Sequence, residues 1–226
     1  MADGHHRYET ALNFHKHLVA EGKDTADGLS GYIAMMLVNM ENSGLVVFPT
    51  HRIVHGLENY STEKILDGCK AYFDIEESDA GEGMRSALLN FYNAGKKAFA
   101  LYAGGKRAHI MVLKDENAVK KFLPEMSDAY CGLDVSVLHN LVLERIFGID
   151  KENMANQKNL SYTRSVDEAI AAVDEGRADC SFIVNPTKVT EIRDVALAGE
   201  KMPQKSTYFY PKLITGLVMN KFADRR

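Results

Sequence analysis

The spacing of apolar residues predicts alternating helices and strands along most of the chain. Between His6 and Ala20 they recur at i, i+3, i+4 and i+7, as on one face of a helix that ends before Gly22. Tyr32–Met40 and Leu45–Phe48 are apolar and rich in strand-forming residues. The loop-like residues between them predict a hairpin.

The later elements follow from the same rules. Gly104 and Gly105 tolerate positive φ and predict a tight turn between two strands. Ser165 and Glu168 have the spacing of a capping box at the start of a helix. Further helices are expected from Thr62, over 84–91 up to Gly95, from Asp134 or Ser136 to Phe147, and over 189–197, with strands over 97–102, 107–113, 160–163 and 180–184.

The order of these elements predicts a mixed α+β fold. Hairpins dominate the first part, whereas strand, helix, strand and helix follow one another from Leu160 to Leu197, which favours a parallel βαβ-type crossover near the C-terminus. No repeat or Pro/Gly/Ser-rich linker interrupts the chain. We therefore expect residues 1–226 to form a single compact domain.

Composition excludes several classes of function. Lys and Arg number 27 and Asp and Glu 31, giving a net charge of −4, which argues against a nucleic-acid partner. No apolar run approaches the roughly 20 residues of a membrane span, and no secretory signal opens the sequence. The three cysteines are widely spaced, which suits a reducing cytoplasm and gives no disulfide framework.

The first candidate site is the segment from Asp3 to Arg7. Gly4 allows close approach of a ligand to the backbone, and the helix that follows presents free amides. Arg7 supplies a planar fork of donors, and His5 and His6 can donate hydrogen bonds or move a proton. Asp3 can hold Mg²⁺ or act as a base. The alternative is that Asp3 only caps the helix and the basic run is a solvated edge.

Four segments in order resemble a bacterial and archaeal family, domain of unknown function one thousand and fifteen. They are 2–11, Phe48–Arg52, Asn185–Leu197 and Lys205–Lys212. Family members usually carry a substantial portion before the first motif. From this resemblance we expect the chain to be the C-terminal part of a longer protein.

The run Asp-Gly-His-His-Arg at 3–7 also resembles, over a short range, the phosphate-binding turn of the ParB and sulfiredoxin superfamily, which includes free-serine kinases. The resemblance implies that Gly4, His5, His6 and Arg7 bind nucleotide phosphates and that Asp3 is a catalytic or metal-linked carboxylate. Sulfiredoxin has a Cys where His5 stands, so reduction of a sulfinic acid is not implied.

Two further stretches offer ligand-binding side chains. His51 and Arg52 are expected to line a polar pocket or a satisfied turn. His51 and His55 would lie about 13 Å apart in a strand, too far to share a zinc ion, so no metal ligands are predicted. Lys205, Ser206 and Lys212 concentrate anion-binding donors in a predicted loop, which can equally be an ordinary surface loop. His139 is expected to be packing, or a side chain pointing into a cleft.

These observations lead to two hypotheses of different classes. In the first, the chain is part of an enzyme that binds ATP, with Mg²⁺, and transfers a phosphoryl group to a small polar substrate, using Asp3, His5 and His6 as catalytic residues. In the second, it is a non-catalytic regulatory module that senses a small anionic metabolite. The sequence leaves the substrate and the oligomeric state open.

Overall fold

The computed structural model describes residues 5–35, 37–42, 44–212 and 216. The chain forms two compact units, one comprising Met1–Val46 with Phe209–Arg226 and the other Val47–Tyr208. The mixed α+β class is confirmed. The organisation of the whole chain as a single domain stays a prediction.

The first unit contains the predicted N-terminal helix. Helix α1 runs from His5 to Ala20 and is followed by the short 3-10 helix η1 at Leu29–Gly31. His15 lies on α1, and its Nδ1 is 2.8 Å from the Ser30 hydroxyl, so its role is a hydrogen bond within this unit. No helix in the described part of the chain is long and apolar enough to cross a membrane.

The predicted hairpin of Tyr32–Met40 with Leu45–Phe48 is wrong. The described residues between 32 and 40 form no strand, and Tyr32 and Leu37 are 62% and 88% exposed. Strand propensity gives a strand only where a neighbour completes the ladder. Strand β1 (Val46–Phe48) pairs instead with β8 (Tyr208–Tyr210), more than 150 residues later.

The second unit is built on a six-stranded sheet in the order β3-β5-β4-β7-β2-β6. Every pair of neighbouring strands in this sheet is antiparallel. The strands are β2 (His51–Val54), β3 (Phe73–Asp79), β4 (Ala98–Tyr102), β5 (Arg107–Leu113), β6 (Leu160–Thr163) and β7 (Cys180–Val184). The hairpin at Gly104–Gly105 is confirmed, with φ of 97° and 81°.

The C-terminal crossover is present in a split form. β6, α7 and β7 follow one another as predicted, but β2 lies between the two strands and is antiparallel to both. β6 and β7 are therefore parallel without being neighbours. The helices are α2 (Thr62–Cys69), α3 (Glu82–Asn93), α4 (Asp128–Cys131), α5 (Asp134–Val137), α6 (Lys151–Asn156), α7 (Val166–Asp174) and α8 (Val189–Leu197).

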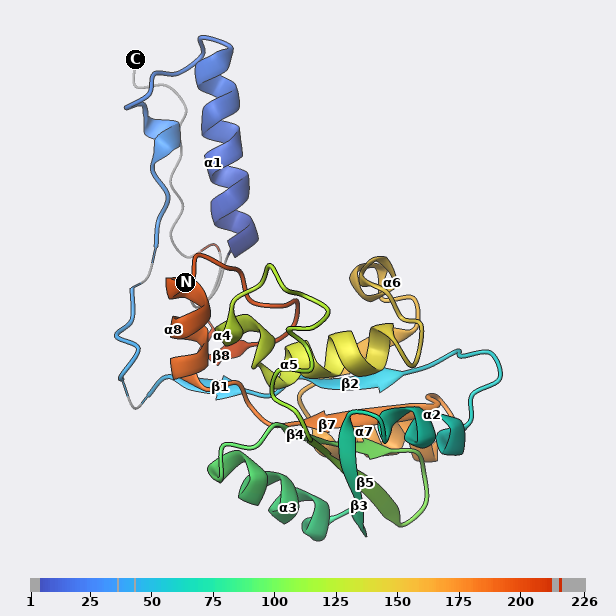
Figure 1. Cartoon of the computed structure of the whole chain (residues 1–226). Helices are drawn as coiled ribbons and strands as arrows, with labels where there is room; N and C mark the ends of the chain where they lie inside the picture. The colour runs from blue at the N-terminus through green and yellow to red at the C-terminus, as the bar shows by residue number, and fades with distance from the viewer. Residues whose placement is uncertain (1–4, 36, 43, 213–215, 217–226) are drawn as a thin grey trace. The chain divides into compact units, whose positions relative to one another are not determined.

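Helices cover both faces of the sheet (Figure 1). α3 and α7 pack on one face, where Met84 and Ala169 meet Ala100 and Ile183. The segment 137–143 packs on the other face, against Phe99, Phe182 and their neighbours. The sequence predicts an ordinary helix here up to Phe147. The structure has α5 as far as Val137, continued by a π-helix, η2, from Leu138 to Glu144.

The N-caps of α2 and α7 are serines close to the positions that the sequence predicts. Thr62, which the sequence suggests as the N-cap of this helix, is its first residue, and Ser61 caps α2 by accepting from the amide of Lys64. Ser165 caps α7 as predicted, accepting from the amide of Glu168 at 3.2 Å. The Glu168 side chain accepts from the Thr163 hydroxyl instead of returning to Ser165. Each serine thereby fixes the start of its helix.

Candidate functional site

The first predicted motif lies at the edge of the described chain. Asp3 and Gly4 are outside the described residues, and α1 begins with the backbone of His5 and His6. Arg7 is exposed on α1. The roles predicted for these side chains stay predictions.

Strand β2 sends its two predicted site residues to opposite faces of the sheet. His51 is paired with Thr163 and Arg52 with Tyr162 on β6, and successive residues of a strand point to opposite sides. Both side chains are buried, with 1% and 0% of their surface exposed. His51 and Arg52 therefore do not line one shared pocket, and each has its own surroundings.

Arg52 is the centre of a buried polar cluster. One terminal nitrogen, Nη1, donates to the carbonyl of Thr50, in a contact two residues back along the chain. The other, Nη2, lies 3.2 Å from Nε2 of His139 and donates to the carbonyl of Lys205 at 3.1 Å. The guanidinium also lies 5.8 Å from the ring centre of Tyr162. Four separated stretches of the second unit meet at this one side chain.

The charge of Arg52 has no acidic partner among the described residues. Its contacts are carbonyls, an imidazole and an aromatic ring. Burial lowers the pKa of Arg52 to about 10, so it remains protonated at neutral pH. Its Nε also lacks a hydrogen-bond partner within the described chain. Burying such an ion costs several kcal/mol unless a counter-charge offsets it, so the cluster has the electrostatics of an anion site.

His139 contacts Arg52 from the π-helix η2. A guanidinium can only donate, so Nε2 of His139 accepts and its proton is on Nδ1. Burial and the nearby Arg52 charge hold the pKa of His139 well below its ordinary value, so the ring is neutral. π-helical turns often occur at functional sites. The sequence left open whether the His139 side chain packs in the core or points into a cleft. Its apolar neighbours along the chain gave no sign of a contact with Arg52.

The predicted loop supplies the third side of the cluster. Lys205 contributes its backbone carbonyl, while its side chain is exposed. The Ser206 side chain is buried and donates to the Pro203 carbonyl at 2.7 Å, and the Ser206 carbonyl accepts from Thr187 at 3.0 Å. Lys212 belongs to the other unit. The structure therefore brings Arg52, Lys205 and Ser206 together, through atoms that the sequence could not specify.

On the opposite face of the sheet, which helices α3 and α7 cover, the side chain of His51 is also buried. Its Nδ1 accepts from the amide of Val184 at 3.2 Å, which leaves the proton on Nε2, an atom without a hydrogen-bond partner among the described residues. Burial and the positive charges of Arg52 and Arg85 lower the pKa of His51 to about 4. His51 is a neutral, buried donor at physiological pH.

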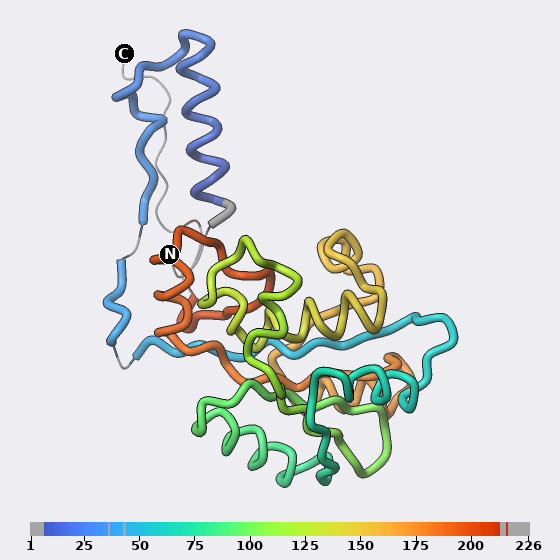
Figure 2. The backbone as a smooth tube through the Cα atoms, in the orientation of Figure 1, coloured from blue at the N-terminus to red at the C-terminus, as the bar shows by residue number. Residues whose placement is uncertain are grey.

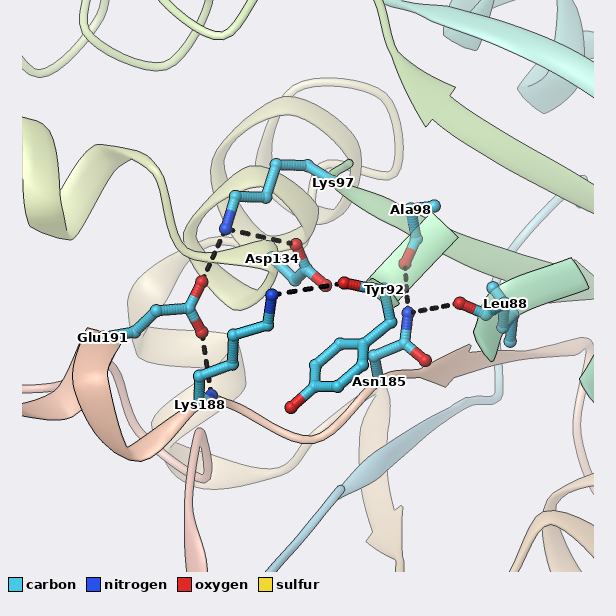
Figure 3. A network of polar contacts seen from close by, with 8 residues as sticks. All are labelled: Leu88, Tyr92, Lys97, Ala98, Asp134, Asn185, Lys188 and Glu191. Carbon is cyan, nitrogen blue, oxygen red and sulfur yellow. Dashed lines mark hydrogen bonds and ion pairs between the residues drawn. The ribbon is translucent and has the colours of Figure 1, made fainter. Parts of the chain in front are cut away.

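The segment Asn185–Leu197 forms a second polar network at the start of α8 (Figure 3). Lys97 lies 2.6 Å from Glu191 and 3.9 Å from Asp134, and Glu191 also accepts from the amide of Lys188 at 2.9 Å. Asn185 donates to the carbonyls of Leu88 and Ala98. The network joins the start of α8 to the start of α5, which leads into the π-helix that carries His139.

Asp134 is the unusual member of this network. Its side chain is 17% exposed. Burial raises its pKa to about 7, with Lys97 acting in the opposite direction and Glu191 adding to the rise. No group of three or more histidine, cysteine or acidic side chains within the described ranges is arranged to hold a metal ion. The network is therefore a framework of ion pairs and hydrogen bonds.

The fold and site define a mixed α+β protein with a buried arginine that no carboxylate contacts within the described part of the chain. The chain belongs to the family described as Protein of unknown function (DUF1015), whose model matches residues 1–136. This confirms the family resemblance. No curated protein matches the sequence.

Three solved structures are similar to this chain, each aligned over 92% of it. A conserved hypothetical protein from Pyrococcus furiosus is 17% identical, with a TM-score of 0.46 and 68% of its own length covered. A free serine kinase mutant in complex with AMP is 16% identical, with a TM-score of 0.45 and 66% of its own length covered. The same kinase mutant in complex with ADP is 18% identical, with a TM-score of 0.44 and 66% of its own length covered. This chain spans about two thirds of the length of each.

Proposed function

We propose that this chain binds a small anionic ligand at Arg52 and is part of an enzyme that transfers a phosphoryl group from a nucleotide to a small polar substrate. One observation carries the anion-binding part: Arg52 is fully buried and charged, and no carboxylate contacts it within the described chain. A planar fork of donors is suited to a carboxylate or phosphate group.

The nucleotide part rests on the motif at 3–7. Helix α1 is described from His5 onward, and the first amides of a helix are the ones that can hold a phosphate. In this proposal Gly4, His5, His6 and Arg7 hold the phosphates. Asp3 accepts the proton of the substrate hydroxyl or holds Mg²⁺.

A second candidate function is a regulatory module that senses a small anionic metabolite. The chemistry around Arg52 favours it, because the Nε2 lone pair of His139 already accepts from the guanidinium. No carboxylate contacts Arg52 among the described residues to act as a base. A site of this kind binds its ligand without reacting with it. The enzyme and the regulatory module would therefore bind the same class of ligand, and only the enzyme would turn it over.

A thermal-shift series on the full chain tests the proposal with ATP and Mg²⁺, AMP, and inorganic phosphate. A ligand at 100 times its dissociation constant adds about 2.7 kcal/mol of stability, which raises the melting temperature by about 5–10 °C for a chain of this size. Arg52→Lys should reduce the shift with inorganic phosphate. Arg7→Ala should reduce it with the nucleotides only.

The exposed Arg107, on strand β5, provides the matched control. Arg107→Ala should leave every shift unchanged. Absence of a shift with all the ligands would refute anion binding. A shift accompanied by ATP hydrolysis or transfer to an added hydroxyl compound supports the enzyme, and a shift without turnover supports the sensor.

A further inference from the structure

The atom that closes the Arg52 cluster comes from a segment without regular structure. Residues 198–207 connect α8 to β8 with neither helix nor strand, as the orange-red part of the tube shows in Figure 2. From this segment the Lys205 carbonyl accepts from Nη2 of Arg52 at 3.1 Å. A neutral carbonyl therefore occupies the position that an oxyanion oxygen would take on the guanidinium.

The conformation that presents this carbonyl is unfavourable for lysine. Lys205 has a φ of 53°, in the left-handed region where a residue with a Cβ atom costs roughly 1 kcal/mol or more relative to its preferred conformation. The neighbouring Ser206 holds the turn through hydrogen bonds with Pro203 and Thr187. The contact with Arg52 is thus made by a turn in which Lys205 is held in the left-handed conformation.

Other donors in the same cluster remain unused. Nε of Arg52 and the hydroxyl of Tyr162 are buried without a hydrogen-bond partner among the described residues. Tyr162 is the cross-strand partner of Arg52, so both side chains lie on the same face of the sheet. An oxyanion with two or more oxygens could take the place of the carbonyl on Nη2 and also reach Nε, giving the bidentate geometry that a single carbonyl cannot provide.

We propose that residues 203–206 are a displaceable lid over Arg52, and that a carboxylate or phosphate group of the ligand replaces the Lys205 carbonyl when it binds. The inference rests on the proposed anion-binding function and adds to it how the ligand gains access. The shared chemistry of the ligand is an oxyanion with at least two oxygens.

Hydrogen exchange of the full chain tests the lid, with inorganic phosphate, ATP and acetate as separate probes. Binding should speed the exchange of amides within 201–207, because this segment leaves its position over Arg52. A response to phosphate and ATP only identifies a phosphate group, whereas a response to acetate identifies a carboxylate. Exchange in 201–207 that stays unchanged while a probe binds would overturn the lid.

Substitutions separate backbone strain from side-chain charge. Lys205→Gly relieves the left-handed strain and stabilises the closed lid, so the dissociation constant of the probe should rise about fivefold. Lys205→Ala removes the charge but keeps the Cβ atom, and should leave affinity close to that of the wild type. Gln157 has the same φ of 53° at the end of α6, so Gln157→Gly is the matched control and should not change affinity.

The outcomes distinguish this inference from the function on which it rests. If the probes bind, Arg52→Lys abolishes binding, and Lys205→Gly behaves like Gln157→Gly, the lid is refuted and the anion site stands. If none of the probes binds the full chain, the anion site itself is refuted, and the lid with it.

Discussion

Arg52 forms its hydrogen bonds with neutral groups. Its contribution to the free energy of unfolding therefore differs from that of an arginine paired with a carboxylate. Replacing a buried ion by an apolar side chain is often neutral or stabilising, because the cost of desolvating the charge disappears. The carbonyls of Thr50 and Lys205 would lose a donor at the same time, and each lost hydrogen bond costs about 1 kcal/mol. These two effects oppose each other.

We therefore expect Arg52→Met to change the free energy of unfolding by about 1 kcal/mol or less in the absence of ligand, while ligand binding is lost. Urea denaturation of both proteins measures the change. A destabilisation above about 3 kcal/mol would identify Arg52 as a structural residue and contradict its assignment as a ligand-binding one.

The two buried imidazoles predict a loss of stability in acid. The pKa of His51 is about 4 in the folded protein against 6.5 for an ordinary histidine, and that of His139 is lowered in the same direction. The unfolded chain therefore binds more protons between these values, so stability falls as pH drops from about 6.5 towards 4. His51 alone accounts for about 3 kcal/mol over this window.

His51→Gln should flatten this part of the stability profile, as unfolding free energies measured between pH 4.5 and 7 would show. The exposed His17 on α1 gives the control, because its side chain is 63% exposed. A profile for His51→Gln as steep as that of His17→Gln would contradict the buried, neutral state of His51.

At the scale of elements, the network that joins α8 to α5 predicts the opposite slope. The pKa of Asp134 is raised to about 7 from 3.8, so the folded protein binds more protons than the unfolded chain between these values. Stability from this group is present at low pH and is lost as pH rises towards 7, by up to about 4 kcal/mol.

Asp134→Asn should remove the loss of stability that accompanies ionisation of Asp134. The difference in unfolding free energy between variant and wild type should therefore shift in favour of the variant between pH 4.5 and pH 7.5. Chemical denaturation at the two pH values measures it. Asp128 is the matched control, since its side chain is 92% exposed. The same pH dependence in wild type and Asp134→Asn would show that Asp134 is ionised throughout this range.

The sequence predicted elements well where local signals decide them. The glycine pair between β4 and β5 and the serine cap of α7 lie where expected. Strand β3 was missed, because its acidic sequence Phe73–Asp79 has an exposed edge and its pairing with β5 is what defines it. The π-helix was missed because a buried apolar run reads the same in both kinds of helix.

The candidate site was predictable only in part for a similar reason. Arg52 and Lys205 were found through the motifs that contain them. That Lys205 contributes a carbonyl, and that His139 reaches Arg52 across 87 residues, depends on the tertiary fold. Successive side chains of β2 point to opposite faces of the sheet, so His51 and Arg52 lie apart. This separation can be predicted once the segment is known to be a strand.

At the scale of the molecule, the second unit contains its own core on both faces of its sheet. We expect a fragment limited to Val47–Tyr208 to unfold cooperatively, because the Arg52 cluster and both cores lie within it. Thermal unfolding followed by circular dichroism checks this. A gradual, non-cooperative transition would show that the unit needs the rest of the chain to fold.

Binding of an oxyanion by Arg52 underlies the proposed function. Calorimetric titration of inorganic phosphate into the full chain at matched ionic strength tests this most directly, in the wild type, Arg52→Met and the surface control Arg107→Met. We predict one site in the wild type and the control, and an affinity at least about tenfold weaker in Arg52→Met, which corresponds to about 1.4 kcal/mol. Equal affinity in all three proteins, or no binding to the wild type, would show that Arg52 is not an oxyanion site.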